Sequence, residues 1–410
     1  EIARLHQPTA EGSEDEIYRA WLAAVDEPAR TARETLHLAR RARAQALEQV
    51  EEIMTMSELP TPRTVHVLTR GRYDSPDPAR PVSAHTPSAL PPSPENAPAN
   101  RLGLAQWLTD PSHPLTARVE VNRLWAQMFG QGLARTLENL GTQGEAPALP
   151  ELLDYLALEF QAESWDIKSM LKRIATSATY RQVSRASIAS AQVDSENLLF
   201  SHYPARRLSA EQLRDQALCA SGLLVERLGG PSVKPWQPPG VWNIGSGGDY
   251  VPDAGEGRWR RSLYTYWRRT TPPPSMTLFD AAKREVCVAR RGQTSTPLQE
   301  LVLLNDPQFV ESARSLAARA MREAGPTQDA RLTRAFRRLC VRPPTPEELA
   351  ALVEVYAASL ADFRADPAAA DALLAVGIAP VAEDADRPDL AALTVACSVL
   401  FAADASLTQR

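Results

Sequence analysis

The sequence has few of the residue patterns that mark metal or haem sites. Its 410 residues include only 4 cysteines and 6 histidines. The cysteines lie far apart, with no CxxC or CxxCH pair, which excludes zinc-ribbon and c-type haem sites. The histidines form no HxH or HExxH motif, so the spacing predicts no metal site, although ligands can converge from distant positions. The cofactor, if there is one, stays unknown at this point.

Several other classes of protein are excluded or disfavoured by absences. The chain has no GxGxxG after a strand, no GxxxxGK[ST] and no GxSxG, so nucleotide-binding and α/β-hydrolase motifs are missing. No apolar run reaches the ~18 residues of a membrane span, and no basic-then-apolar leader follows Glu1, so we expect a soluble, mature or excised piece. A net charge of −5 disfavours a globally basic nucleic-acid binder.

Apolar residues recur at steps of three and four along most of the chain, which predicts a mainly α-helical fold with few or no short strands. Residues 14–56 show this period with a break near Glu27 and Pro28, so two helices are expected there. The helical period returns from residue 101 to 228 and again after residue 296. We therefore predict a helical bundle.

Local signals predict where several of these helices begin and end. Gly130 is expected to end a helix, and Ser164 precedes a new one. Residues 209–212 and 296–299 have the Ser/Thr-x-x-Gln pattern of a capping box, which predicts two further helix starts, and a further helix is expected from Thr345 to Leu360.

Two stretches interrupt the helical pattern and define the expected domains. Residues 59–100 contain ten prolines, which predicts an extended linker or wrapping segment. Residues 229–296 are rich in Pro, Gly, Arg and aromatic residues, and such a long irregular stretch often carries function. We therefore expect an N-terminal helical hairpin over 1–58, the linker over 59–100, and a main helical domain over 101–410 with a site segment at 229–296.

The irregular segment contains a positive island. Residues 258–291 carry nine positive and two negative charges, a net charge of +7, so the remainder of the chain carries −12. Guanidinium groups bind anions in bidentate fashion, and aromatic rings stack on sugars. The candidate ligand-binding residues are Arg260, Arg261, Tyr264, Trp267, Arg268, Arg269, Arg284, Arg290 and Arg291. The alternative is that these arginines cross-link the loops by bonding to backbone carbonyls.

The same segment contains the candidates for catalysis. Asp280 and Glu285 could transfer protons, one of them being kept protonated. The many nearby arginines favour ionisation, which suits ion pairing better than a general acid. Cys287 lies between Arg284 and Arg290, a setting that favours a nucleophilic thiolate, but a small buried residue is the expected alternative.

Many stretches of the chain together resemble a known family. They are RLGLAQWL (101–108), HPLTARVEVNRLW (113–125), FGQGL (129–133), TSATYR (176–181), RRLSAEQLRD (206–215), RRSLYTYW (260–267), TPLQ (296–299) and LNDP (304–307). In this order they resemble the C-terminal planctomycete-specific domain of unknown function, which is found in exported proteins that often carry a cytochrome c-like segment. The resemblance covers roughly residues 50–410. It implies a periplasmic or extracellular location in a polysaccharide-rich or redox-linked setting.

Two functions follow as expectations. The first is an exported protein that binds an anionic carbohydrate, a sulfated or uronic-acid polysaccharide, with processing of that polymer as a further option. The second is a non-catalytic scaffold that docks an exported cytochrome or another surface protein, with the arginines as internal struts. Whether the chain is an enzyme stays open.

Overall fold

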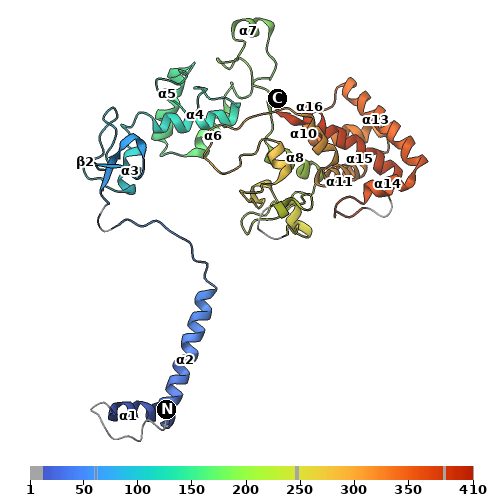
Figure 1. Cartoon of the computed structure of the whole chain (residues 1–410). Coiled ribbons are helices and arrows are strands. Elements are labelled where there is room, and N and C mark those ends of the chain that lie inside the picture. The colour runs from blue at the N-terminus through green and yellow to red at the C-terminus, as the bar shows by residue number, and fades with distance from the viewer. Residues whose placement is uncertain (1–12, 60, 62, 245–248, 382–384, 410) are drawn as a thin grey trace. The chain divides into compact units, whose positions relative to one another are not determined.

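The computed structural model describes residues 13–59, 61, 63–244, 249–381 and 385–409. Helices dominate this part of the chain, and its strands form only two small two-stranded sheets, which confirms the predicted mainly α-helical fold (Figure 1). The chain divides into two compact units, one of residues 1–85 and 98–103, the other of residues 86–97 and 104–410. The domain boundaries that the sequence indicates at residues 58 and 100 stay predictions.

The first unit contains two helices and a hairpin. Helix α1 spans Ser13–Ala24 and α2 spans Glu27–Glu48, with the predicted break between them, where the Asp26 side chain accepts a hydrogen bond from Ala29 N (2.9 Å). No residue of α2 is buried, so the apolar period that continues to residue 56 has no surface to pack against, and the helix ends earlier than predicted. Strands β1 (Val65–Leu68) and β2 (Pro76–Val82) pair antiparallel.

The second unit begins with a group of helices around an aromatic core. Helix α4 spans Thr116–Phe129, α5 spans Pro150–Ala162 and α6 spans Ile167–Thr176. Gly130 ends α4 in the left-handed region (φ 82°), as predicted. A helix does follow Ser164, and its cap is Asp166, whose side chain accepts from Lys168 N and Ser169 N.

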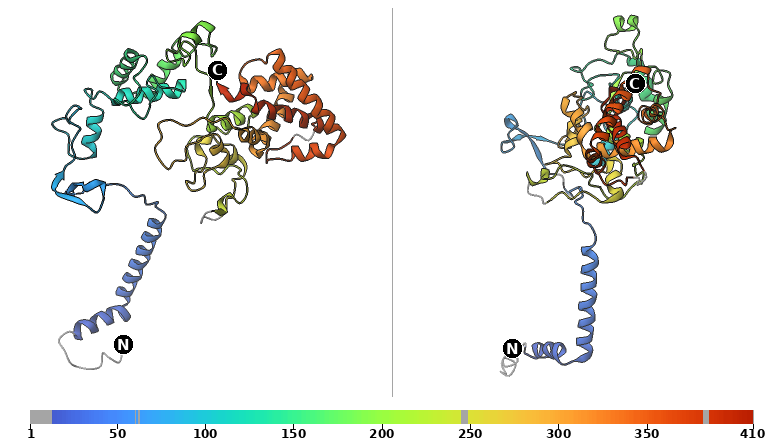
Figure 2. Two further views of the ribbon diagram at one scale, coloured as in Figure 1. Left: turned by 45° about the horizontal axis from the view of Figure 1, so that its top comes forward. Right: turned by 90° about the vertical axis from the view of Figure 1, so that its right-hand side faces the viewer.

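The larger group of helices packs around α15 (Arg387–Ala402), ten of whose residues are buried. Figures 1 and 2 show α15 in dark red among its neighbours, of which α11 and α13 make the most extensive contacts. The other helices of this group are α8 (Ala210–Ser221), α10 (Pro297–Asn305), α11 (Pro307–Glu323), α12 (Gln328–Cys340), α13 (Pro346–Ala365) and α14 (Pro367–Leu374). A capping box begins α8 at Ser209, as predicted, and another begins α13 at Thr345, where a helix was expected.

The segment of residues 229–296 is irregular, as the sequence indicates. Its described residues form short helical turns at Val241–Ile244, Gly255–Trp259 and Ser262–Tyr264 and the five-residue helix α9 (Pro274–Leu278). Single bridges join Val225 to Arg260 and Val233 to Thr265. The remaining elements are the turn Thr69–Gly71, α3 (Arg101–Leu108), α7 (Ile188–Val193), β3 (Arg206–Arg207), α16 (Asp404–Leu407) and β4 (Thr408–Gln409).

None of the helices in the described ranges combines the length and the apolar character that crossing a membrane requires.

Candidate functional site

Arg214 of α8 anchors the irregular segment to the helices. Its buried guanidinium donates to the carbonyl oxygens of Arg258 (2.6 Å) and Arg260 (2.9 Å) and to the side chain of Gln308 (3.0 Å). Burial lowers the pKa of Arg214 to about 10, so the group stays charged near neutral pH. Because carbonyls in a loop need donors, this one side chain fixes the backbone on both sides of Trp259.

Arg260 is a second internal cross-link. The residue is 1% exposed, and its guanidinium donates to the carbonyl oxygens of Arg227 (2.9 Å), Gly229 and Pro231 (3.1 Å). It also lies over the ring of Tyr264, 3.7 Å from the centroid. Because both terminal nitrogens donate to carbonyl oxygens and the whole side chain is buried, Arg260 is not accessible to a ligand, and we remove it from the candidate binding set.

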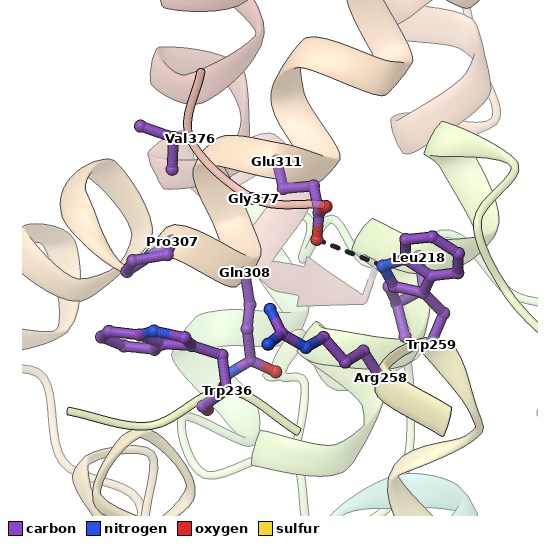
Figure 3. A pocket seen from close by; sticks show the side chains of 9 residues that line it. All are labelled: Leu218, Trp236, Arg258, Trp259, Pro307, Gln308, Glu311, Val376 and Gly377. Atoms are coloured by element: carbon purple, nitrogen blue, oxygen red, sulfur yellow. Dashed lines mark hydrogen bonds between the residues drawn. The ribbon is translucent and has the colours of Figure 1, made fainter. Parts of the chain in front are cut away.

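A cavity of about 340 Å³ lies where the irregular segment meets α8 and α11. Two indole rings, Trp236 and Trp259, lie on opposite sides of it in Figure 3. Gln308 positions the backbone of Trp236, because its side-chain nitrogen donates to Trp236 O (2.9 Å). The lining consists of Leu218, Trp236, Arg258, Trp259, Pro307, Gln308, Glu311, Val376 and Gly377.

Arg258 supplies an uncommitted positive charge to this cavity. Its Nε donates to Asp253 O (2.7 Å), which fixes the side chain, and its two terminal nitrogens donate to no described residue. Figure 3 shows the guanidinium pointing into the cavity toward the side of Trp236. A fixed guanidinium with two open nitrogens is suited to a bidentate hydrogen bond with a carboxylate, sulfate or phosphate group.

Glu311 of α11 forms the part of the cavity wall next to Trp259. It is 4% exposed, and its Oε2 accepts from Trp259 Nε1 (3.1 Å) while its Oε1 accepts from Ile378 N and Ala379 N (2.6 Å). One carboxylate therefore orients an indole ring and holds the loop after α14. Gly377 makes room for it, since a Cβ at that position would lie 2.5 Å from the carboxyl group.

The model of the family described as "Protein of unknown function (DUF1553)" matches residues 100–356, more than half of the chain. The chain belongs to the DUF1553 family. No curated protein and no solved structure matches the chain. Most of the cavity lining lies inside the matched range, but Val376 and Gly377 lie beyond it.

None of the nine predicted ligand-binding residues lines the cavity between Trp236 and Trp259 of this DUF1553 protein. Arg268 lies 4.8 Å from the ring centroid of Trp242, Arg284 lies 4.5 Å from that of Trp267, and both arginines therefore cover aromatic faces. The Tyr264 hydroxyl accepts from Gly229 N (2.7 Å), so that ring serves the loop backbone.

The other predicted arginines lie at the surface. Arg291 pairs with Glu211 (2.8 Å), and the half-exposed Arg261 lies 3.8 Å from Glu226. Arg269 is exposed, and Arg290 borders a second cavity of about 330 Å³ beside Arg135. The structure thus spreads the positive island over several surfaces, because the irregular chain changes direction repeatedly.

Asp280 and Glu285 are not brought together at the cavity. Asp280 accepts from Thr294 N (2.8 Å), Thr294 Oγ1 (2.9 Å) and the guanidinium of Arg207. Desolvation raises the pKa of Asp280, but these hydrogen bonds outweigh it and hold the pKa below its usual value. Glu285 is exposed and lines no part of the cavity. This geometry favours ion pairing for Asp280.

Cys287 is exposed, which corrects the expectation of a small buried residue. It lies in the exposed stretch of residues 283–293, where the chain has no apolar surface to cover it. Within the described ranges, no three His, Cys, Asp or Glu side chains gather as metal ligands would.

The sequence interpretation missed Trp236, Gln308 and Glu311. A signal for Glu311 exists, because it interrupts the apolar period of α11 next to Phe309, Val310 and Ala313. A charged residue on a buried helix face needs partners or a ligand. Trp236 gives no comparable signal, since it lies in a segment without a period.

Proposed function

We propose that this chain binds an anionic saccharide, part of a sulfated or uronic-acid polysaccharide, in the cavity between Trp236 and Trp259. The observation that carries the proposal is the guanidinium of Arg258, whose two terminal nitrogens point into a cavity between two indole rings. Apolar sugar faces stack on indoles, and guanidinium groups bind carboxylate or sulfate groups.

The size of the cavity supports a small ligand segment. Ligand pockets span roughly 300–1,000 Å³, and this cavity lies near the lower end of that range. One or two sugar units fit such a volume. Exposed arginines outside the cavity, Arg261, Arg269, Arg284 and Arg290, would add weaker contacts to the rest of a polymer.

The cellular setting of the proposal comes from the family resemblance. Exported proteins meet polysaccharides in the periplasm or outside the cell, and we propose that location for this chain. The proposal concerns binding, because Asp280 and Glu285, the residues considered for proton transfer, do not line the cavity.

Calorimetry on the full chain at low salt tests the proposal. The unmodified protein should bind uronic-acid or sulfated oligosaccharides, and Arg258→Ala should weaken binding at least ten-fold, because a charge-assisted hydrogen bond contributes about 1.5–3 kcal/mol. Arg185→Ala is the matched control, since Arg185 is exposed and far from the cavity lining in sequence. Equal affinity of the two variants, or no binding to any anionic saccharide, would overturn the proposal.

A docking role is the second candidate, and one observation favours it. Helices α1 and α2 expose large apolar side chains, among them Tyr18, Trp21 and Leu36, each at least 45% exposed. Such residues are typical of protein contact surfaces. If docking is the function and the arginines of residues 258–291 serve only as struts, Arg268→Ala and Arg291→Ala will lower the melting temperature, and the unmodified chain will bind no anionic saccharide.

A further inference from the structure

The polar groups that remain available in the cavity define the ligand more narrowly. Both ends of the Gln308 side chain are engaged, one by Arg214 Nε (3.0 Å) and the other by Trp236 O (2.9 Å). Arg258 keeps two terminal nitrogens. Glu311 accepts three hydrogen bonds, two at Oε1 and one at Oε2. A carboxylate has about four acceptor positions, so one position at Oε2 is left.

Glu311 cannot turn away from the cavity. Its Oε1 is held by two backbone amides of the loop after α14, and Arg314 lies 4.0 Å away on the same helix. The guanidinium of Arg314 is itself held by Leu374 O and Ala379 O (both 2.7 Å). A fixed, buried acceptor favours a ligand that brings a hydrogen-bond donor to it.

A uronic acid and a densely sulfated sugar would make different contacts with Arg258 and Glu311. A uronic acid has one carboxylate for Arg258 and hydroxyl groups that donate to Glu311. A sugar whose hydroxyls are replaced by sulfate has only acceptors and negative charge to offer at Oε2. Because Glu311 is itself buried, such a contact is repulsive and leaves the acceptor unpaired.

We infer that the cavity selects a uronic-acid unit with free hydroxyls over a densely sulfated one, and that Glu311 determines this selectivity. The inference rests on the proposed function, since it names the class of anionic saccharide that the same cavity binds.

The first test compares two ligands on the unmodified full chain. Calorimetry at low salt measures the affinity of a galacturonic acid disaccharide and of the same disaccharide sulfated at all its hydroxyls. The unsulfated ligand should bind at least ten-fold more tightly. The exposed arginines favour the sulfated ligand, so a preference for the unsulfated one must come from the cavity.

The outcomes separate the inference from the proposed function. If the sulfated ligand binds equally or more tightly and Arg258→Ala abolishes that binding, the inference fails and the proposed function stands. If neither ligand binds, both fail.

The second test removes the negative charge of Glu311. Glu311→Gln keeps the size of the side chain and removes its charge, and it should reduce the preference for the unsulfated ligand at least three-fold. Glu256→Gln is the matched control, because it removes a 70% exposed charge two residues from Arg258. An unchanged preference in a folded Glu311→Gln protein overturns the inference, and circular dichroism checks the fold. If that variant does not fold, the two-ligand comparison decides.

Discussion

At the scale of single residues, three neighbouring arginines have three different environments. Arg258 points into a cavity, Arg260 is bound by three carbonyl oxygens, and the side chain of Arg261 is 47% exposed. Their shared positive charge is visible in the sequence. What each guanidinium contacts depends on the path of the backbone, which Arg214 fixes from a distant helix.

The first prediction concerns the role of Asp280. Asp280→Asn should lower the free energy of unfolding by about 1–3 kcal/mol at pH 7, because the ion pair with Arg207 is lost. Since the pKa of Asp280 is lowered in the folded state, its contribution is present above the ordinary pKa and is lost as pH falls. Urea unfolding at pH 7 and pH 3 should show the difference shrinking in acid. Glu285→Gln, at an exposed position, should change little, and an equal loss in both variants would contradict the prediction.

The second prediction concerns Gly377. Gly377→Ala should lower the free energy of unfolding by about 1–3 kcal/mol more than Gly229→Ala. Both glycines have positive φ (89° and 75°), but only at Gly377 would a Cβ contact Glu311, whereas nothing lies within 4 Å at Gly229. Urea unfolding of both variants isolates the steric effect. Equal decreases in the free energy of unfolding would contradict the prediction and show that the Glu311 side chain moves to accommodate the added Cβ.

At the scale of elements, the third prediction uses the start of α11. Desolvation raises the pKa of Asp306, the N-cap of this helix, to about 6. Because the folded protein binds this proton more tightly than the unfolded chain, protonated Asp306 adds to the free energy of unfolding below its ordinary pKa of 3.8. This added stability is lost as the pH rises through about 6. This loss is about 3 kcal/mol for a shift of this size.

Asp306→Asn keeps a good N-cap and removes the titration. Thermal unfolding from pH 4 to pH 7.5 should show the unmodified protein losing stability relative to Asp306→Asn. Asp166→Asn, at the exposed N-cap of α6, is the control. A constant difference between the unmodified protein and Asp306→Asn would contradict the raised pKa.

Elements with local signals could be predicted from the sequence. Most of the longer helices, the break before α2, Gly130 after α4 and the cap at Ser209 follow from periodicity and capping, which act over a few residues, whereas α9 lies in the segment predicted to have no helix. The cavity could not be predicted, because Trp236, Arg258 and Glu311 meet only after two helices and an irregular segment have packed. The positive island indicated the segment that lines the cavity, but none of the nine residues predicted to bind a ligand lines it.

At the scale of the whole molecule, the fourth prediction concerns fragments. A fragment of residues 86–410 should unfold cooperatively, with a melting temperature within a few degrees of the full chain, because both buried clusters lie inside it. A fragment of residues 100–356, the range of the family match, should fail to fold, since it lacks α15 and its ten buried residues. Calorimetric unfolding of the two fragments checks this, and a cooperative transition in the shorter one would contradict it.

The short sheet of β3 and β4 joins Arg206 and Arg207 to Gln409 and Thr408, about two hundred positions apart. Arg206 also reaches Gln127 O, on the helix α4. During synthesis on the ribosome, this connection can form only after residue 409 has left the exit tunnel. The cluster around α4, α5 and α6 uses only residues between 121 and 203, so the link to β4 forms after that cluster can already be complete.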